Sequence, residues 1–175
     1  MRTYLRLFVG MYLIGVAFAD LSTGRFDSVN LSYGKTNVSN VGVFSNAWAW
    51  DMPVYPSQDS SMSFQLGIMR WQDNTPSDHS FVGLHAGTVL KMVLPTQSVH
   101  FLPHVDLGLG AAYFGRKDFA DYHLASNFKL EASALLAANF GSKEQYDIGI
   151  AYAGYFLGGG DDVHVLPRLI VGYHF

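Results

Sequence analysis

The chain has 175 residues, a formal net charge of −3 and no cysteine. This length fits one domain, the lack of thiols excludes a disulfide framework and thiolate metal or redox sites, and the acidic balance without a basic stripe argues against nucleic acid as a partner. Charged residues make up only 14% of the chain, against about 25% in ordinary soluble domains. Beyond the first residues no segment approaches a transmembrane helix, so the hydrophobicity must follow another pattern.

The N-terminal residues have the three parts of a secretory signal peptide. Two arginines accompany an apolar run over residues 7–16, and small residues follow at 17–19. The run is shorter than the ~20 residues that a transmembrane helix needs. We therefore predict that residues 1–19 are a signal peptide cleaved before Asp20, and that residues 20–175 form the exported domain. The alternative is a buried N-terminal helix.

The exported domain alternates apolar and polar residues with a period of two, which is typical of strands with two different faces. A barrel strand crosses a membrane with ~9–11 residues, and eight such strands with short turns occupy nearly all of this chain. The predicted strands are, in chain order, 28–38, 41–50, 62–71, 80–94, 100–114, 125–140, 146–157 and 163–175.

Two of these strands need comment. Residues 125–140 are rich in good helix formers, but the alternation around Lys129 and Glu131 favours a strand. In the last strand, every second residue from Phe175 back to Val163 is apolar or aromatic, which predicts one continuous outward face. Tyr173 and Phe175 also resemble the C-terminal signal of bacterial outer-membrane barrels, so we expect the barrel-assembly machinery to be a partner.

These elements predict an all-β fold, an eight-stranded antiparallel up-and-down transmembrane β-barrel in the outer membrane of a Gram-negative bacterium. An even number of strands places both termini on one side, the periplasm in such barrels. A barrel of eight strands is just wide enough for side chains to fill, so its polar inner residues should pair with each other rather than line a pore. The residues predicted to face inward are Gln65, His85, His104, Asp106, Lys129, Glu131, Asp147 and Arg168.

A soluble lipocalin-like barrel is the competing architecture, with its apolar residues inside around a small ligand. Alternation alone does not say which face is inside. The terminal aromatic residue, the aromatic ends of strands and the glycines confined to the polar face favour the membrane barrel, with lipid and lipopolysaccharide around it.

Several strings of the sequence carry a resemblance to a known family. They are NAWAWD (46–51), FLPHVDLGLGAAYFG (101–115), LASNFKLEASALLAANF (124–140) and IGIAYAGYFLGG (148–159). Together with the order of elements they resemble the outer-membrane lipid A 3-O-deacylases of the PagL family. The resemblance implies a serine-esterase triad, with a His-x-Ser pair on the seventh strand and a Glu on the eighth. In that chemistry the histidine takes the serine proton and the carboxylate orients the histidine.

The positions that match this triad carry other residues here. The histidine position is Gly154, the serine position is Phe156, and the glutamate position falls at Val165 or the adjacent His164. We therefore predict a non-catalytic barrel with a structural, envelope or surface-interaction role and no cofactor. The alternative is an active lipid A deacylase with a displaced site, which a lipid-facing Ser–His pair on adjacent strands would favour.

Acidic residues gather in two predicted outer loops. Together with nearby histidines they could bind a divalent cation that bridges lipopolysaccharide phosphates, because hard cations prefer carboxylate oxygens. The alternative is an ordinary solvated cluster of loop charges, and no resident metal is predicted. The oligomeric state stays open. The acidic residues concerned are Asp118, Asp121, Asp161 and Asp162.

Overall fold

The computed structural model describes most of the predicted exported domain. The predicted signal peptide lies outside the described residues, so its cleavage stays a prediction. The described residues are 26–38, 41–52, 60–74, 80–98, 100–120, 122–141, 145–156 and 162–175.

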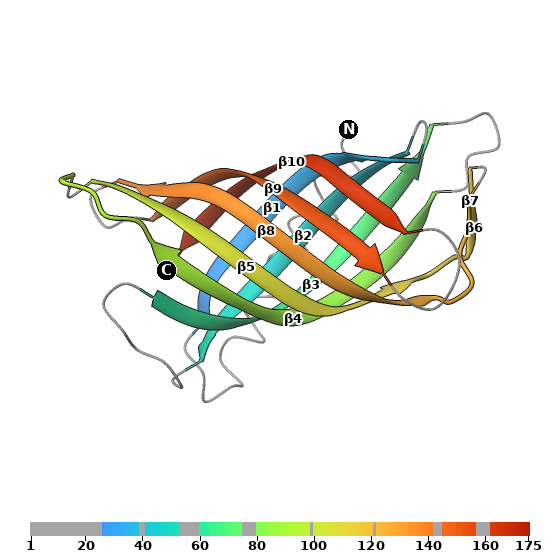
Figure 1. Ribbon diagram of the computed structural model, residues 1–175, viewed down its shortest axis with the longest axis horizontal. Helices are drawn as coiled ribbons and strands as arrows, with labels where there is room; N and C mark the ends of the chain where they lie inside the picture. Colours follow the sequence, from blue (N-terminus) through green and yellow to red (C-terminus); the bar gives the residue numbers. More distant parts are fainter. Residues whose placement is uncertain are drawn as a thin grey trace.

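Eight long antiparallel strands close into a barrel (Figure 1). Neighbours in the chain pair with each other around the barrel, and the first strand closes on the last in the order β1-β10-β9-β8-β5-β4-β3-β2. The all-β prediction is confirmed, and so is the strand interpretation of residues 125–140, although the strand begins at Phe128. The barrel strands are β1 (Phe26–Thr36), β2 (Val41–Met52), β3 (Ser60–Asp73), β4 (Phe81–Val93), β5 (Phe101–Phe114), β8 (Phe128–Phe140), β9 (Tyr146–Phe156) and β10 (Val163–His174).

A short ribbon lies in the loop between β5 and β8. It consists of β6 (Asp118–Phe119) and β7 (Tyr122–His123), which pair only with each other. This loop is at the end of the barrel opposite the start of β1 and the end of β10, called here the loop end; the other end is called the terminal end (Figure 1). No helix in the described part of the chain is long and apolar enough to cross a membrane.

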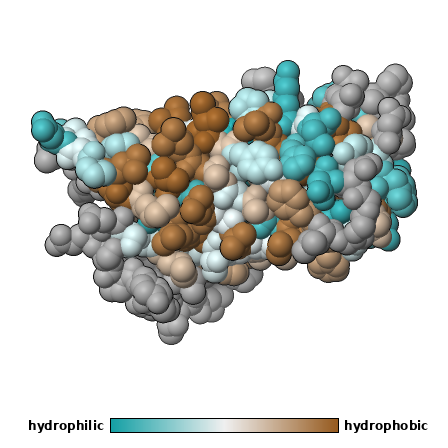
Figure 2. Space-filling view, viewed as in Figure 1, coloured by the Kyte–Doolittle hydropathy of each residue, from teal (hydrophilic) through white to brown (hydrophobic). Residues whose placement is uncertain are grey.

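The apolar residues of the alternating pattern form the outer wall. Leu109, Leu136 and Ile150 are each more than half exposed, whereas polar residues of the same strands are buried inside. Figure 2 shows apolar side chains across the middle of the barrel and hydrophilic ones gathered toward its ends. This distribution is that of a wall facing lipid, and it rules out the lipocalin-like alternative, in which the apolar face would be inside.

The prediction of one continuous outward face on the last strand is wrong. The register between β10 and β9 shifts between Val165 and Arg168, so Val163 and Val165 are buried inside while Tyr173 faces outward. An irregularity of one residue exchanges the two faces of a strand. Pro167 lies in this interval and has no N–H to offer to the ladder, which is why prolines within sheets are found at such irregularities.

The interior divides into a polar part and an apolar part. The polar residues predicted to face inward all do so: they are buried, or they line interior cavities as Gln65 and Asp106 do. The apolar part was not predicted, and it fills the loop end around Trp71, whose ring centroid lies 4.8 Å from that of Phe114 and 5.6 Å from that of Tyr155. Phe119 from the ribbon and Leu124 are fully buried in this cluster, so the loop end is closed by side chains.

Candidate functional site

The positions that match the family's triad lie on β9 and β10 near the loop end. Gly154 pairs directly with His164 across the two strands. The Oη of Tyr152 lies 2.6 Å from Nδ1 of His164, and the two rings are stacked with centroids 5.8 Å apart. The Phe156 ring meets the same imidazole edge-on at 5.5 Å. Tyr152, Phe156 and His164 are called here the β9–β10 aromatic cluster, and it lies on the outer wall.

The backbone of His164 is held by a side chain from a distant turn. Its N–H donates to Oδ1 of Asn37 at 2.8 Å, and its carbonyl accepts the N–H of Asn37 at 3.0 Å. Nδ2 of Asn37 also donates to Tyr122 in the β5–β8 loop and to the carbonyl of Asp162, each at 3.2 Å. Asn37 therefore connects the β5–β8 loop and the segment before β10 to the edge of the aromatic cluster by hydrogen bonds. Sequence reasoning missed it, because an asparagine in a turn has no distinguishing pattern.

The histidine position of the family has no free space here. A Cβ atom at Gly154 would lie 2.2 Å from Cζ of Phe156 and 2.7 Å from Oη of Tyr152. The two residues that match the family's glutamate position face opposite sides of the barrel wall. Val165 is fully buried inside the barrel, because the register shift turns it inward, and the outer-wall neighbour of Gly154 is His164. A carboxylate at residue 165 could therefore not orient a base on the outer wall.

The described strands do not provide a serine to replace the missing one. Every serine of the described barrel strands lines an interior cavity, so the lipid-facing Ser–His pair that would favour a displaced site is not found among them. The hydroxyl–imidazole pair on the outer wall is Tyr152 with His164. The serines concerned are Ser28, Ser32, Ser45, Ser60, Ser61, Ser63 and Ser133.

Of the four acidic residues predicted to contact a cation, the structure describes Asp118 and Asp162. Oδ1 of Asp118 lies 2.5 Å from Nδ1 of His123, and both side chains are exposed. This hydrogen bond holds the pKa of the Asp118 carboxyl below its usual value. Among the described residues there is no group of three or more His, Cys, Asp or Glu side chains that could hold a metal ion. Asp121 and Asp161 lie outside those residues, so the predicted cation contact with Asp162 stays untested.

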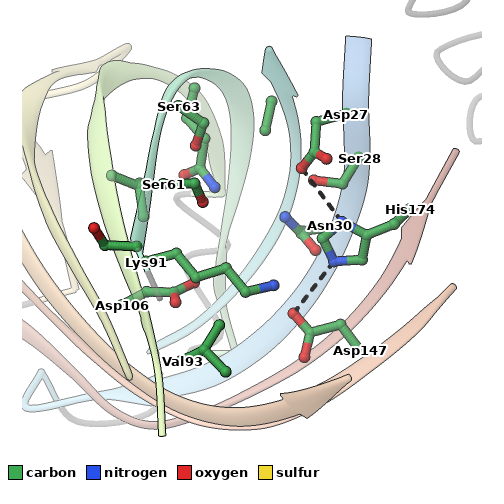
Figure 3. A pocket seen from close by; sticks show the side chains of 14 residues that line it. Asp27, Ser28, Asn30, Ser61, Ser63, Lys91, Val93, Asp106, Asp147 and His174 are labelled. Atoms are coloured by element: carbon green, nitrogen blue, oxygen red, sulfur yellow. Dashed lines mark ion pairs between the residues drawn. The ribbon is translucent and has the colours of Figure 1, made fainter. Parts of the chain in front are cut away.

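Inside the terminal end is a polar cavity of about 170 Å³. Figure 3 shows charged side chains from several strands pointing into it. His174 Nδ1 lies 3.3 Å from Asp27 and its Nε2 lies 3.9 Å from Asp147. The fully buried His104 lies 3.2 Å from Asp147 and 2.7 Å from Asp106. Carboxylate and imidazole groups thus alternate along a network that connects β1, β10, β9 and β5.

Further inside, Arg168 and Glu131 also have polar partners. The Arg168 guanidinium donates to the hydroxyls of Ser32 and Ser45, and His85 lies 3.3 Å from Glu131. Buried polar groups that satisfy one another in this way stabilise a single arrangement of the strands. We interpret the interior as a structural network.

The crowding at Gly154 leads to a prediction. Changing Gly154→Ala is expected to lower the free energy of unfolding by about 1–3 kcal/mol, because the added methyl group meets rings on both sides. In a Phe156→Ala background most of this loss should disappear, since the nearer ring is gone. Urea unfolding of the barrel in lipid vesicles measures both effects.

Gly149 supplies a matched control on the same strand. Its Cβ would lie 2.3 Å from that of Ala137 and away from Phe156. The loss caused by Gly149→Ala should therefore be the same with and without the Phe156 ring. If the stability losses caused by Gly154→Ala and Gly149→Ala depended equally on the Phe156 ring, the proposed contact between residue 154 and that ring would be contradicted.

A closed eight-stranded barrel with an apolar outer wall, a polar interior, and the start of β1 and the end of β10 at one end has the architecture of an outer-membrane β-barrel. The sequence model of the lipid A 3-O-deacylase (PagL) family matches residues 39–155. The chain belongs to the PagL family. The matched segment includes Gly154 but ends one residue before Phe156, and it does not reach β10.

Solved structures agree with this architecture. The crystal structure of the outer membrane enzyme PagL is 16% identical, with a TM-score of 0.68 over 83% of this chain and 98% of that one. Neisserial surface protein A is also 16% identical, with a TM-score of 0.51 over 86% of this chain and 96% of that one. None of the curated proteins compared with the chain matches it. At these identities the structures show the fold that the chain shares with them.

Proposed function

We propose that this chain is a non-catalytic member of the PagL family with a structural, envelope or surface-interaction role in the bacterial outer membrane. The observation that carries the proposal is the β9–β10 aromatic cluster, because its rings occupy the space beside Gly154 that a catalytic histidine would need. Ester hydrolysis of this type needs an activated nucleophile within reach of the lipid. The serines of the described strands line the interior cavities or their mouths.

The proposal includes export and assembly. Residues 1–19 are removed as a signal peptide, and the outer wall contacts membrane lipid and lipopolysaccharide. Tyr173 and Phe175 present aromatic rings with centroids 5.1 Å apart at the end of β10, and we propose that the barrel-assembly machinery recognises them. The intact mass of protein extracted from the membrane should correspond to a chain that begins at Asp20.

An active deacylase with a displaced site is the second candidate. The hydrogen bond between Tyr152 and His164 favours it, because a hydroxyl bound to an imidazole is the arrangement in which a base activates a nucleophile. Against it, a tyrosine would have to replace serine, and no carboxylate partner of His164 is found among the described residues.

Mass spectrometry of lipid A from cells with and without this protein separates the two candidates. We expect an unchanged acyl pattern, with heat-modifiable migration showing that the barrel is folded in the membrane. Loss of one 3-O-linked acyl chain on expression would overturn the non-catalytic proposal. If Tyr152→Phe and His164→Ala each abolished that loss, the displaced site would be the aromatic cluster itself.

A further inference from the structure

The barrel closes at a seam between its first strand β1 and its last strand β10, and the strand pairing is irregular around this seam. The pairings of β1 with β10, of β1 with β2 and of β10 with β9 each contain a register shift. The other described strand pairs of the barrel run without one. A register shift locally disrupts the ladder of hydrogen bonds, so side-chain contacts gain importance in holding the seam together.

The half of the seam nearest the terminal end is continuous. Residues 28–34 of β1 pair in register with residues 168–174 of β10, whereas the pairing shifts between residues 34 and 36. Beyond the last pair, the N–H of Phe175 donates to the carbonyl of Asp27 at 2.9 Å. The continuous half therefore closes the barrel at the terminal end, and it ends beside the polar cavity.

Two carboxylates hold the His174 side chain at this end, one from each neighbour of β10. Nδ1 of His174 lies 3.3 Å from Oδ2 of Asp27 on β1, and its Nε2 lies 3.9 Å from Oδ2 of Asp147 on β9 (Figure 3). The imidazole thus joins β10 to β1 across the seam and connects both strands to β9. Asp27, His174 and Asp147 are called here the seam clamp.

The charged groups around the seam clamp balance when its imidazole and that of His104 are protonated. Oδ1 of Asp147 lies 3.2 Å from Nε2 of His104, whose Nδ1 lies 2.7 Å from Asp106. Lys91 of β4 points into the same cavity and donates to Asn139 (Figure 3). Three carboxylates then face three cations. The carboxylates are those of Asp27, Asp106 and Asp147, and the cations are Lys91, His104 and His174.

The chemistry of imidazole explains why these rings need both protons. A neutral imidazole has one N–H donor and one acceptor nitrogen, and an ionised carboxylate only accepts. A ring between two carboxylates can therefore interact favourably with both only as the imidazolium ion. Loss of the second proton turns a nitrogen lone pair toward a carboxylate oxygen and leaves negative charge without compensation inside the barrel, which is costly.

The seam clamp is open to the solution at the terminal end. The side chain of His174 is 19% exposed and that of Asp27 is 31% exposed, and both residues line the cavity of about 170 Å³. The His104 side chain, in contrast, is fully buried. His174 can therefore exchange protons with the solvent while the barrel stays folded.

We propose that the seam clamp makes closure of the barrel sensitive to pH: protonated His174 holds β1 to β10, and its deprotonation releases the terminal-end half of the seam. Histidines of the unfolded chain lose their protons near pH ~6.5, so above that pH the clamped barrel binds more protons than the unfolded chain. The stability of the seam therefore falls as the pH rises. In the proposed orientation, an alkaline periplasm loosens the seam.

Amide hydrogen exchange of the full barrel in lipid nanodiscs, followed by NMR, tests this proposal. Protection factors remove the effect of pH on the intrinsic exchange rate. They are compared for residues 28–32 and 170–174 of the seam and for the regular β5–β8 pairing. From about pH 6 to about pH 9, seam protection should fall at least about tenfold, the size of a lost hydrogen bond between charged groups. Protection of the β5–β8 pair should stay unchanged.

Variants of residue 174 separate its charge from its other contacts. His174→Gln removes the titrating group, so its seam should be weakly protected at both pH values. His174→Lys stays cationic over this range and should keep the protection without the pH dependence. The matched control is His100→Gln, since His100 is exposed just before β5 and its variant should behave like the unchanged protein.

A cross-link over the seam supplies a further control. Leu31 and Val171 pair across it, and the chain has no cysteine of its own. A disulfide formed after changing Leu31→Cys and Val171→Cys should therefore remove the pH effect on the seam.

Three outcomes would overturn the proposal. Constant seam protection over this pH range in the unchanged protein would exclude the pH sensitivity, whether or not the variants fold. An equal fall in the β5–β8 pairing would indicate a general loosening of the barrel. A pH dependence that survives in His174→Gln would assign the titration to another group, such as His104. Heat-modifiable migration verifies folding. An altered acyl pattern of lipid A would contradict the non-catalytic proposal but not this one.

Discussion

Changing Trp71→Ala is expected to lower the free energy of unfolding by about 3–5 kcal/mol, the range for truncating a large buried aromatic residue. Trp71 is fully buried, and its ring meets those of Phe114, Tyr155 and Phe119 at centroid distances of 4.8, 5.6 and 5.9 Å. Removing it leaves a cavity between strands and loop that these neighbours cannot fill. Urea titration in lipid vesicles, followed by far-UV circular dichroism, measures the loss.

Phe128→Ala is the control for this variant. Phe128 is 66% exposed on the outer wall, so lipid chains can fill the space that its ring leaves and no cavity forms. Its loss should be clearly smaller than that of Trp71→Ala. A loss as large or larger for Phe128 would show that the cluster at the loop end is not a main source of barrel stability.

Changing His104→Ala is expected to lower the free energy of unfolding by about 3–5 kcal/mol, because removing one partner leaves the others buried without compensation. The imidazole is fully buried between Asp106 and Asp147. The network then loses its link between β5 and β9. The same urea titration reports the effect.

His100→Ala provides a control with the same residue type. His100 is exposed and lies just before β5, so its substitution should stay within about 0.5 kcal/mol of the unchanged protein. If the two histidine variants were equally stable, the carboxylates around residue 104 would have to be satisfied without it. The interior would then not be the structural network proposed here.

The strands were predictable because an outer wall facing lipid leaves a long, regular alternation in the sequence. The predicted and observed strands share their central residues throughout, and the boundaries differ by at most three residues. In strand β10 the alternation does not predict which residues face outward. Val163 and Val165 are apolar because the loop end of the interior is apolar, while Val171 and Tyr173 are apolar because they face outward. The hydrophobic pattern of β10 therefore does not show that its two faces exchange.

Of the candidate site, too, only a part could be predicted from the sequence. Period-two spacing places Gly154 and Phe156 on one face, and the structure has both on the outer wall beside Tyr152. The pairing of Tyr152 with His164 depends on the register of β10, which the sequence does not specify. Phe119 and Leu124 were a missed signal, since large apolar residues in a loop that also carries several charges indicate a segment that folds back onto the protein.

The closed loop end has a consequence for exchange between the two sides of the membrane. Side chains from strands and loop are packed without exposure around Trp71, whereas Asp27 and His174 at the terminal end keep contact with solvent. The interior is therefore a cavity closed at the loop end and not a channel. With the terminal end in the periplasm, as the sequence predicts, we expect water, protons and small ions in the interior to exchange with the periplasm and not with the outside of the cell.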